Sequence, residues 1–475
     1  MEKKNVWETY TEEQLQELEL FSKEYMTFLD EGKTERECVD LIVNEIEKAG
    51  YVELTHLQKK KKKLKAGDKV YAVCMNKSVV MFHIGKEPLE KGMNILGAHI
   101  DSPRLDVKQN PLYEDGGFAY LDTHYYGGVK KYQWVTIPLA LHGVVIKKDG
   151  TCVEIKIGEN EEDPVFFVSD LLIHLAQEQL EKKANKVIEG EALDIIVGNR
   201  PLKLEAEEVD GKEDKKKEKD PVKAAVLKLL KEDYDMEEED FLSAELEVVP
   251  AGKARDAGFD RSMILAYGQD DRVCAFASLK AMLELNEVNR TACCLLVDKE
   301  EIGSVGATGM RSQFFENCLA EVLELCGGYQ ELQLRRCLAA STMLSSDVSS
   351  AYDPSYASSF DKKNVAYLGG GMVFNKFTGS RGKSGSNDAN AEYLAYIRKI
   401  FEEDEICFQT AELGRVDLGG GGTIAYILAL YGMQVIDSGV AVLNMHAPWE
   451  ATSKADVYET KRGYASFLAH NGMEG

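Results

Sequence analysis

The sequence has no long apolar run and no excess of basic residues, and each absence excludes a class of protein. No stretch is long enough to span a bilayer, and Met1–Asn5 leads into a polar, Glu-rich segment without the apolar core of a signal peptide. We therefore expect neither a signal peptide nor a membrane partner. The chain carries 57 Lys and Arg against 81 Asp and Glu, a net charge of -24. Because phosphate binding needs clustered cations, we do not expect nucleic acid as a partner.

Cysteine is present, but no two cysteines have the C-x-x-C spacing of a metal or redox motif. Several of the ten cysteines lie inside apolar runs such as Thr291–Val297. This placement is typical of small buried side chains in a reducing compartment and not of a disulfide framework. We therefore expect a cytoplasmic protein.

A length of 475 residues favours two domains over one. Residues 1–105 have an α/β pattern, and the same pattern returns over residues 255–475. Between them, residues 106–254 consist mainly of strand-like pieces with Gly-Gly turns, and a charged segment, residues 207–220, has no apolar periodicity. We interpret that segment as a flexible excursion. The sequence predicts an α/β domain interrupted by a β-rich insertion.

Local signals place several elements of the α/β domain. Capping boxes at Thr11 and Thr34 predict two helices, and the apolar runs Val79–Ile84 and Met93–Leu96 predict buried strands. The basic run Lys59–Lys63 is interpreted as a solvated loop. Further helices are expected at Asp271–Leu285 and Asn387–Phe401, and a buried strand at Thr291–Val297.

Five segments each place a possible metal ligand at the end of an apolar run; they contain His99, Asp270, the pair Glu300–Glu301, Asp347 and His446. A His at the carboxyl end of a strand lies where open α/β sheets bind ligands, and Asp101 can hydrogen-bond its other ring nitrogen. One Glu of an adjacent pair can ligate a metal while the other polarises a water. Two His and three carboxylates suit zinc, with cobalt or manganese possible. From these residues alone, satisfied structural polar groups remain the alternative.

The five segments read, in order, H-I-D-S-P-R, Q-D-D-R, D-K-E-E-I-G-S, S-S-D-V and M-H-A-P-W-E. This ordered set resembles the aspartyl aminopeptidase and vacuolar aminopeptidase I family of dinuclear zinc metallopeptidases, over almost the whole chain. The resemblance implies a zinc-peptidase-like α/β catalytic domain with helices on both faces of a mixed sheet. It also implies an aminopeptidase that hydrolyses the N-terminal residue from peptides with a free N-terminus.

What the resemblance implies for single residues is specific. His99, Asp270 and Asp347 would hold one zinc ion, and Asp270, Glu301 and His446 the other, so Asp270 bridges two zinc ions per subunit. Glu300 would be the general base for a water that bridges the two ions. Asp101 would be the partner of His99.

The insertion corresponds in this resemblance to the family's dimerisation domain, and family members assemble such dimers into tetrahedral dodecamers. Its segment Asp170–Ala176 is similar to one whose His reaches the active site of a neighbouring subunit. His174 is therefore a candidate substrate-binding residue, and an ordinary helix-face residue is the alternative.

The sequence also departs from the aspartyl members of the family. Gln269–Asp271 stands where those members have L-D-N. The stretch Val373–Lys383 falls where they carry a basic residue for acidic side chains, and it offers three candidates for that role: Lys376, Arg381 and Lys383. Acidic and neutral N-terminal residues both remain open as preferred substrates.

Two other functions remain open beside the aminopeptidase. One is a sister dinuclear zinc hydrolase, a carboxypeptidase or an N-acyl amino acid deacylase. The other is a catalytically silent shell used as a scaffold. The presence of all five ligand types and of the Glu base counts against the scaffold.

Overall fold

The computed structural model describes residues 5–203, 208–209, 212–213, 218–379 and 384–473. The chain divides into two compact units. The first comprises Met1–Ser102 and Ala254–Gly475, and the second is the intervening stretch Pro103–Lys253. Two segments far apart in the sequence therefore build the first unit together. Half of the charged segment 207–220 lies outside the described residues.

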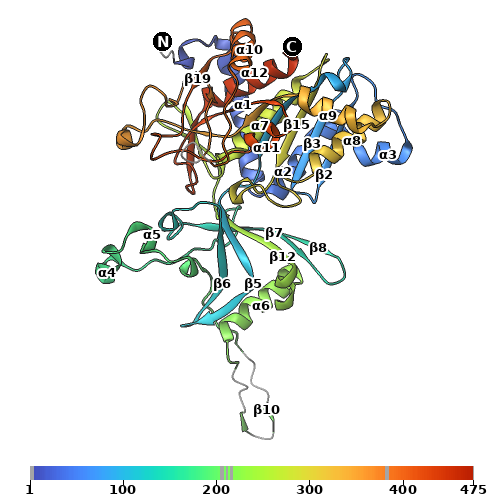
Figure 1. The fold of residues 1–475 in the computed structure, drawn as a ribbon. Coiled ribbons are helices and arrows are strands. Elements are labelled where there is room, and N and C mark those ends of the chain that lie inside the picture. Colours follow the sequence, from blue (N-terminus) through green and yellow to red (C-terminus); the bar gives the residue numbers. More distant parts are fainter. Residues whose placement is uncertain (1–4, 204–207, 210–211, 214–217, 380–383, 474–475) are drawn as a thin grey trace. The chain divides into compact units, whose positions relative to one another are not determined.

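A nine-stranded mixed sheet forms the centre of the first unit (Figure 1). Its spatial order is β1 (Val52–Glu53), β2 (Lys69–Cys74), β3 (Ser78–His83), β15 (Thr291–Val297), β4 (Met93–His99), β16 (Thr342–Ser346), β20 (Gln434–Gly439), β18 (Met372–Asn375) and β19 (Phe408–Thr410). A five-stranded sheet has the order β13 (Arg255–Ala257), β14 (Met263–Ala266), β22 (Glu450–Ser453), β21 (Ala441–Leu443) and β17 (Ser349–Ser350).

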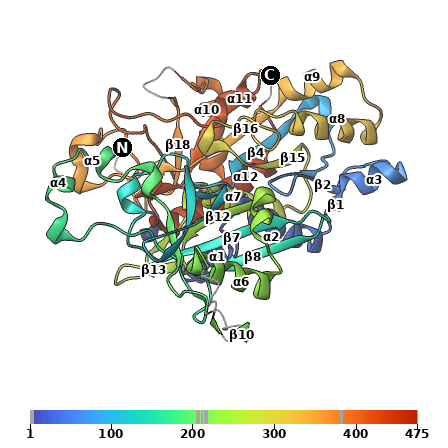
Figure 2. The same cartoon turned by 90° about the horizontal axis from the view of Figure 1, so that it is seen from below.

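Helices cover both faces of the nine-stranded sheet, as predicted. They are α1 (Glu12–Glu31), α2 (Glu35–Lys48), α3 (Leu54–Lys60), α7 (Gln269–Glu284), α8 (Phe314–Cys326), α9 (Glu331–Ala340), α10 (Ala391–Glu403), α11 (Ala425–Ala429) and α12 (Lys454–Ala469). Successive side chains of a strand point to opposite faces. Accordingly, Cys293 and Leu295 belong to the core that contains α8 and α9, whereas Cys294 and Leu296 belong to the core that contains α1, α7 and α12. The view from below shows α8 beside α9 (Figure 2).

The predicted helix starts at Thr11 and Thr34 are confirmed, since each Thr caps its helix in a complete capping box. Two local predictions were wrong in part. The helix expected from Asn387 begins at Ala391, because the Asn387 side chain donates to the Val435 carbonyl and its backbone N–H to Thr378. The Lys run is exposed, and Lys61–Lys63 lie outside any helix, as predicted, but Lys59 and Lys60 belong to α3, whose other face is buried by Leu54 and Leu57.

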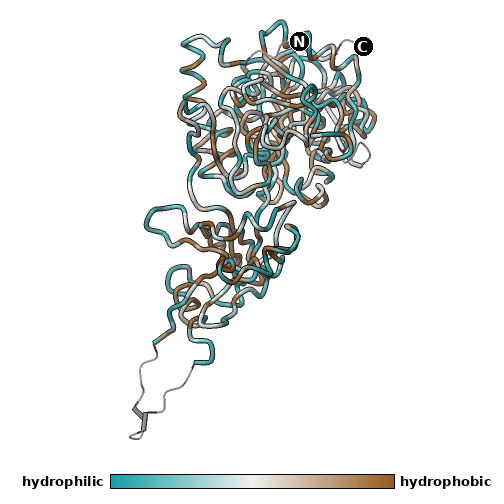
Figure 3. Tube along the Cα trace, turned by 90° about the vertical axis from the view of Figure 1, so that its left-hand side faces the viewer, coloured by the Kyte–Doolittle hydropathy of each residue, from teal (hydrophilic) through white to brown (hydrophobic). Residues whose placement is uncertain are grey.

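The second unit contains a six-stranded antiparallel sheet, which confirms the β-rich character expected of the insertion. Its order is β8 (Cys152–Ile157), β7 (Leu139–Ile146), β12 (Ala244–Pro250), β5 (Arg104–Asp115), β6 (Phe118–Tyr126) and β9 (Ile195–Gly198). Hydrophobic stretches gather in the middle of this unit (Figure 3). Its helices are α4 (Gln177–Leu180), α5 (Ala184–Val187) and α6 (Pro221–Tyr234), and β10 (Glu208–Val209) pairs with β11 (Lys212–Glu213). Within the described residues, no helix has the length and hydropathy needed to cross a bilayer.

Candidate metal centre

Three neighbouring parallel strands bring polar side chains to one edge of the large sheet. β4 lies between β15 and β16 and is parallel to both. His99 is the last residue of β4, Asp347 follows β16, and the Glu300–Ile302 turn follows β15 shortly after its end. Because the carboxyl ends of parallel strands meet at one edge, these residues converge there.

The five-stranded sheet positions the other two candidate metal ligands. Asp270 lies at the start of α7, which follows β14, and His446 lies in the turn between β21 and β22. β22 pairs with both β14 and β21, so Ala266 of β14 is opposite Glu450 of β22. This pairing places the loop after β14 beside the loop that carries His446. The Asp270–Asp271 peptide bond is cis.

The Asp270 carboxylate lies between two imidazole rings. Its Oδ1 is 3.2 Å from His99 Nε2, and its Oδ2 is 3.3 Å from His446 Nε2. His99 Nε2 is also 3.8 Å from Asp347 Oδ1, and His446 Nε2 is 3.5 Å from Glu301 Oε1. The structure therefore brings together all five residues that the sequence proposed as ligands.

Two groups of three donor atoms are close enough to hold a metal ion. One group is His99, Glu300 and Asp347, and the other is His99, Asp270 and Glu301, with the donor atoms of each group within 4.8 Å of one another. Glu300, which the sequence proposed as a base, thus lies among the candidate ligands.

The carboxylates of this cluster are crowded and buried. Burial raises the pKa of Glu301, and the charge of Asp270 raises it further. Burial and the nearby Asp347, Asp101 and Asp270 raise the pKa of Glu300 to about 8, against the effect of His99. At Asp270, burial acts in the same direction, but His446 and His99 outweigh it and hold the pKa below the usual range.

This donor set fits a zinc ion. Oδ1 of Asp270 and Oε1 of Glu301 are buried and accept no hydrogen bond from any residue that the structure describes. Buried charges of this kind are costly unless they are paired or coordinate a metal. Imidazole nitrogens and carboxylate oxygens are both zinc ligands, and a dication would favour the ionised form of each carboxylate.

Asp101 supports the cluster from behind His99. Its Oδ1 is 3.3 Å from His99 Nδ1, and its backbone carbonyl is 3.0 Å from the same nitrogen. The carboxylate also accepts hydrogen bonds from the backbone N–H groups of Glu300 (3.1 Å) and Glu301 (3.2 Å). Asp101 therefore orients one imidazole and two carboxylate-bearing residues at once.

Glu450 is a supporting residue to which sequence reasoning gave no role. Its carboxylate accepts hydrogen bonds from the backbone N–H groups of Asp270 and His446. Burial raises the pKa of Glu450 to about 8, with a further contribution from Asp270. The sequence feature that could have pointed to Glu450 is its position four residues after His446, in the last of the five segments.

The proposed substrate-binding residues lie in three different settings. His174 is exposed in the second unit, in a short 3-10 turn, Ile173–Leu175. Lys376 follows β18, and its Nζ lies 2.6 Å from Asp388 Oδ1 and over the Phe377 ring. Arg381 and Lys383 lie outside the described residues.

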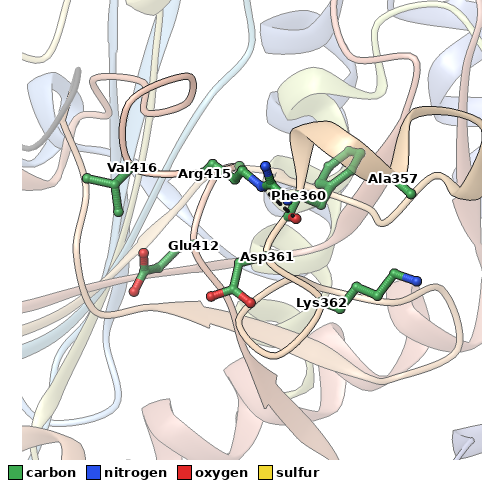
Figure 4. Close-up of a pocket in the computed structure, with 8 residues that line it drawn as sticks. Ala357, Phe360, Asp361, Lys362, Glu412, Arg415 and Val416 are labelled. Carbon is green, nitrogen blue, oxygen red and sulfur yellow. Dashed lines mark hydrogen bonds between the residues drawn. The ribbon is translucent and has the colours of Figure 1, made fainter.

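A pocket of about 440 Å³ is lined by none of the proposed site residues (Figure 4). Asp361, Lys362, Glu412 and Arg415 supply its charged groups, and Arg415 Nε donates to the Phe360 carbonyl at 3.4 Å.

A His- and carboxylate-lined site at the carboxyl edge of an α/β sheet is typical of zinc-dependent peptidases. Residues 28–468 match the family described as "Aminopeptidase I zinc metalloprotease (M18)". The chain therefore belongs to the M18 family of zinc metallo-aminopeptidases. Of the functions that the sequence left open, this match supports the aminopeptidase and not the sister hydrolase or the silent scaffold.

Individual relatives agree with this assignment. The chain is 61% identical over 467 residues to the probable M18 family aminopeptidase 1 of Clostridium acetobutylicum, with 98% of each chain covered. It is similar to the crystal structure of an M18 aminopeptidase from Thermotoga maritima, with a TM-score of 0.91, 44% identity, and 98% and 99% of the two chains covered. The S. cerevisiae mApe1 dodecamer, at 20% identity and a TM-score of 0.73, covering 94% of this chain and 96% of that one, shares the fold.

Chelation is expected to abolish peptidase activity and added zinc to restore it, while the fold survives. The sheet that carries the site is covered by two apolar cores, so folding does not depend on the metal. Activity and circular dichroism, measured on the same chelated sample with verified metal content, check the loss of activity and the survival of the fold. Activity that persists at zero metal would contradict the assignment of the site.

Proposed function

We propose that this aminopeptidase removes single N-terminal residues from peptides with two zinc ions per subunit. His99, Asp270 and Asp347 would hold one ion, and Asp270, Glu301 and His446 the other. The observation that carries this proposal is the position of the Asp270 carboxylate, with one oxygen near each imidazole. Cobalt or manganese could replace zinc at such N/O sites.

Within this proposal, Glu300 is the general base. When bound, zinc acts as a Lewis acid and lowers the pKa of a coordinated water to about 7. The Glu300 carboxylate would take a proton from the attacking water and later deliver it to the leaving amine. Burial and the neighbouring carboxylates raise the pKa of Glu300 to about 8, and bound zinc would lower it again, so that the carboxylate is ionised and can accept a proton near neutral pH. Asp101 would hold the two Glu residues and His99 in place for this step.

A free amine on the substrate is expected to be required. An aminopeptidase recognises the N-terminal ammonium or amine, whereas a deacylase accepts an N-acylated residue and a carboxypeptidase acts at the other end. One peptide should be assayed free and N-acetylated, with product identity read by mass spectrometry. Release of the first residue from the free peptide alone is the expected result, and hydrolysis of the acetylated peptide at a comparable rate would refute the proposal.

Glu300→Gln is expected to lower kcat by about 10²–10⁴-fold while the zinc content stays unchanged. The amide keeps the shape of the Glu side chain but cannot accept the proton of the attacking water. Glu412→Gln, from the separate pocket, is the matched control and should retain activity. Turnover and metal content are measured on the same preparations. Loss of zinc together with activity would make Glu300 a ligand, and near-normal turnover would place the base elsewhere.

The second unit is proposed to form dimers in which His174 reaches the active site of a neighbouring subunit. The residues around His174 support an interface: Leu171, Leu172, Ile173, Leu175 and Leu180 are each at least 46% exposed. Contiguous exposed apolar side chains are typical of protein–protein contacts. A neutral imidazole there could donate a hydrogen bond to a substrate carbonyl or developing oxyanion. Assembly of such dimers into a dodecamer, as in the mApe1 structure, is part of the same proposal.

Two inactive variants, Glu300→Gln and His174→Phe, are expected to regain activity when their subunits exchange. A mixed dimer would contain one site with an intact Glu300 and an intact partner His174. His124→Phe, at an exposed His of β6, is the control and should be active without mixing. Exchange is verified with differently tagged subunits. Demonstrated exchange without recovered activity would exclude a role of His174 across the interface.

The substrate side chain is proposed to face at least one of Lys376, Arg381 and Lys383. Lys376 has an acidic partner, Asp388, which reduces its net attraction for an acidic substrate. The cytoplasmic location remains a prediction from the sequence.

A further inference from the structure

Glu450, the first residue of β22, connects two loops that come from distant parts of the sequence. Its side chain is buried, with 1% of its surface exposed. Oε2 accepts the backbone N–H of Asp270 at 3.0 Å, and Oε1 accepts the backbone N–H of His446 at 2.7 Å. Each oxygen of one carboxylate therefore serves one residue of the candidate metal centre.

The loop that carries His446 needs such an external contact. His446 has a φ of 64° and Asn444 a φ of 61°, and both are side-chain-bearing residues in the left-handed region. Asn adopts this conformation readily, whereas for His446 it is less favourable and persists where surrounding contacts hold it. The bond from the His446 N–H to Glu450 is one of those contacts.

The anchor itself belongs to a buried hydrogen-bond network. The Glu450 backbone carbonyl accepts a hydrogen bond from Gln269 Nε2 at 2.7 Å, and the Gln269 Oε1 accepts the hydroxyls of Tyr25 and Thr452. Gln269 directly precedes Asp270, so the same buried network holds both ends of the span from Asp270 to Glu450. The donor carboxylate and imidazole are thereby set at a fixed spacing.

We propose that Glu450 is a positioning residue that sets the spacing of Asp270 and His446 and thereby the affinity of the zinc ion assigned to Asp270, Glu301 and His446. This inference rests on the two-zinc site of the proposed function. It goes beyond that proposal because Glu450 is not one of the proposed ligands and acts only through two backbone N–H groups. Asp101 holds the backbone of Glu300 and Glu301 in the same manner.

Two substitutions separate position from charge. Glu450→Gln keeps the length of the side chain, but its amide has a single acceptor oxygen, so one of the two N–H groups loses its partner. Glu450→Asp keeps the negative charge, but the shorter side chain cannot reach both N–H groups from the same backbone position. A positioning role predicts that both variants are impaired.

The measurement is zinc occupancy of the full-length protein under graded competition by a chelator. Wild type is expected to bind two zinc ions. In both variants the zinc site of Asp270, Glu301 and His446 should weaken by about 10–100-fold, the range found when residues that orient metal ligands are replaced. The other site shares only Asp270 with it and should weaken less. A merely structural role would lower the unfolding temperature and leave both zinc affinities unchanged.

Asp456→Asn is the matched control. Asp456 is a fully buried carboxylate that accepts the backbone N–H groups of Gly369 and Gly371, both at 2.8 Å, and bonds to none of the proposed ligands. It should lose stability without losing zinc. Equal zinc loss in the control, unchanged zinc affinity in Glu450→Gln, or wild-type affinity in Glu450→Asp would each overturn the inference. A wild type that binds fewer than two zinc ions would instead contradict the two-zinc function.

Discussion

The parallel pairing of β4 with β15 and β16 is the constraint on which the site depends. In this register Val297 is opposite His99, and Ser345 is opposite Gly97. The three strands therefore end almost level, and the residues that follow them meet at the same edge of the sheet. A shift of one residue in either pair would turn alternate side chains to the other face of the sheet. The position of His99 relative to Glu300 and Asp347 is thus fixed by backbone hydrogen bonds far more than by the side chains themselves.

The cost of this convergence is electrostatic. Four acidic side chains meet in one small region, where burial disfavours their charged forms: Asp270, Glu300, Glu301 and Asp347. Two imidazoles offset part of this charge. The remaining negative charge suits the cluster to divalent cations, because Asp270 Oδ1 and Glu301 Oε1 accept no hydrogen bond within the described part of the chain. The same crowding gives Glu300 a pKa near neutrality.

Much of the site could be predicted from the sequence because its residues follow strands with strong apolar patterns. His99 ends such a strand, and Glu300, Glu301 and Asp347 follow one directly or shortly after its end; short-range patterns reveal strand ends. Glu450 could not be found in this way, because its contribution is two hydrogen bonds to backbone groups, and those depend on tertiary pairing of β22 with β14. The start of α10 was misplaced for a similar reason, since Asn387 bonds to Val435 across the fold. The family resemblance supplied the roles of the residues, which periodicity alone left open.

The interruption of the first unit by the second has a consequence for the order of synthesis. His99 is made before the insertion begins, Asp270 after it ends, and His446 close to the end of the chain. The strands β15 and β16, which flank β4, are also made late. A ribosome-bound chain therefore carries an unpaired β4 and an incomplete set of ligands until His446 has emerged. Peptidase activity cannot arise before that point, so the topology itself postpones hydrolysis until the insertion and both parts of the first unit up to His446 have been made.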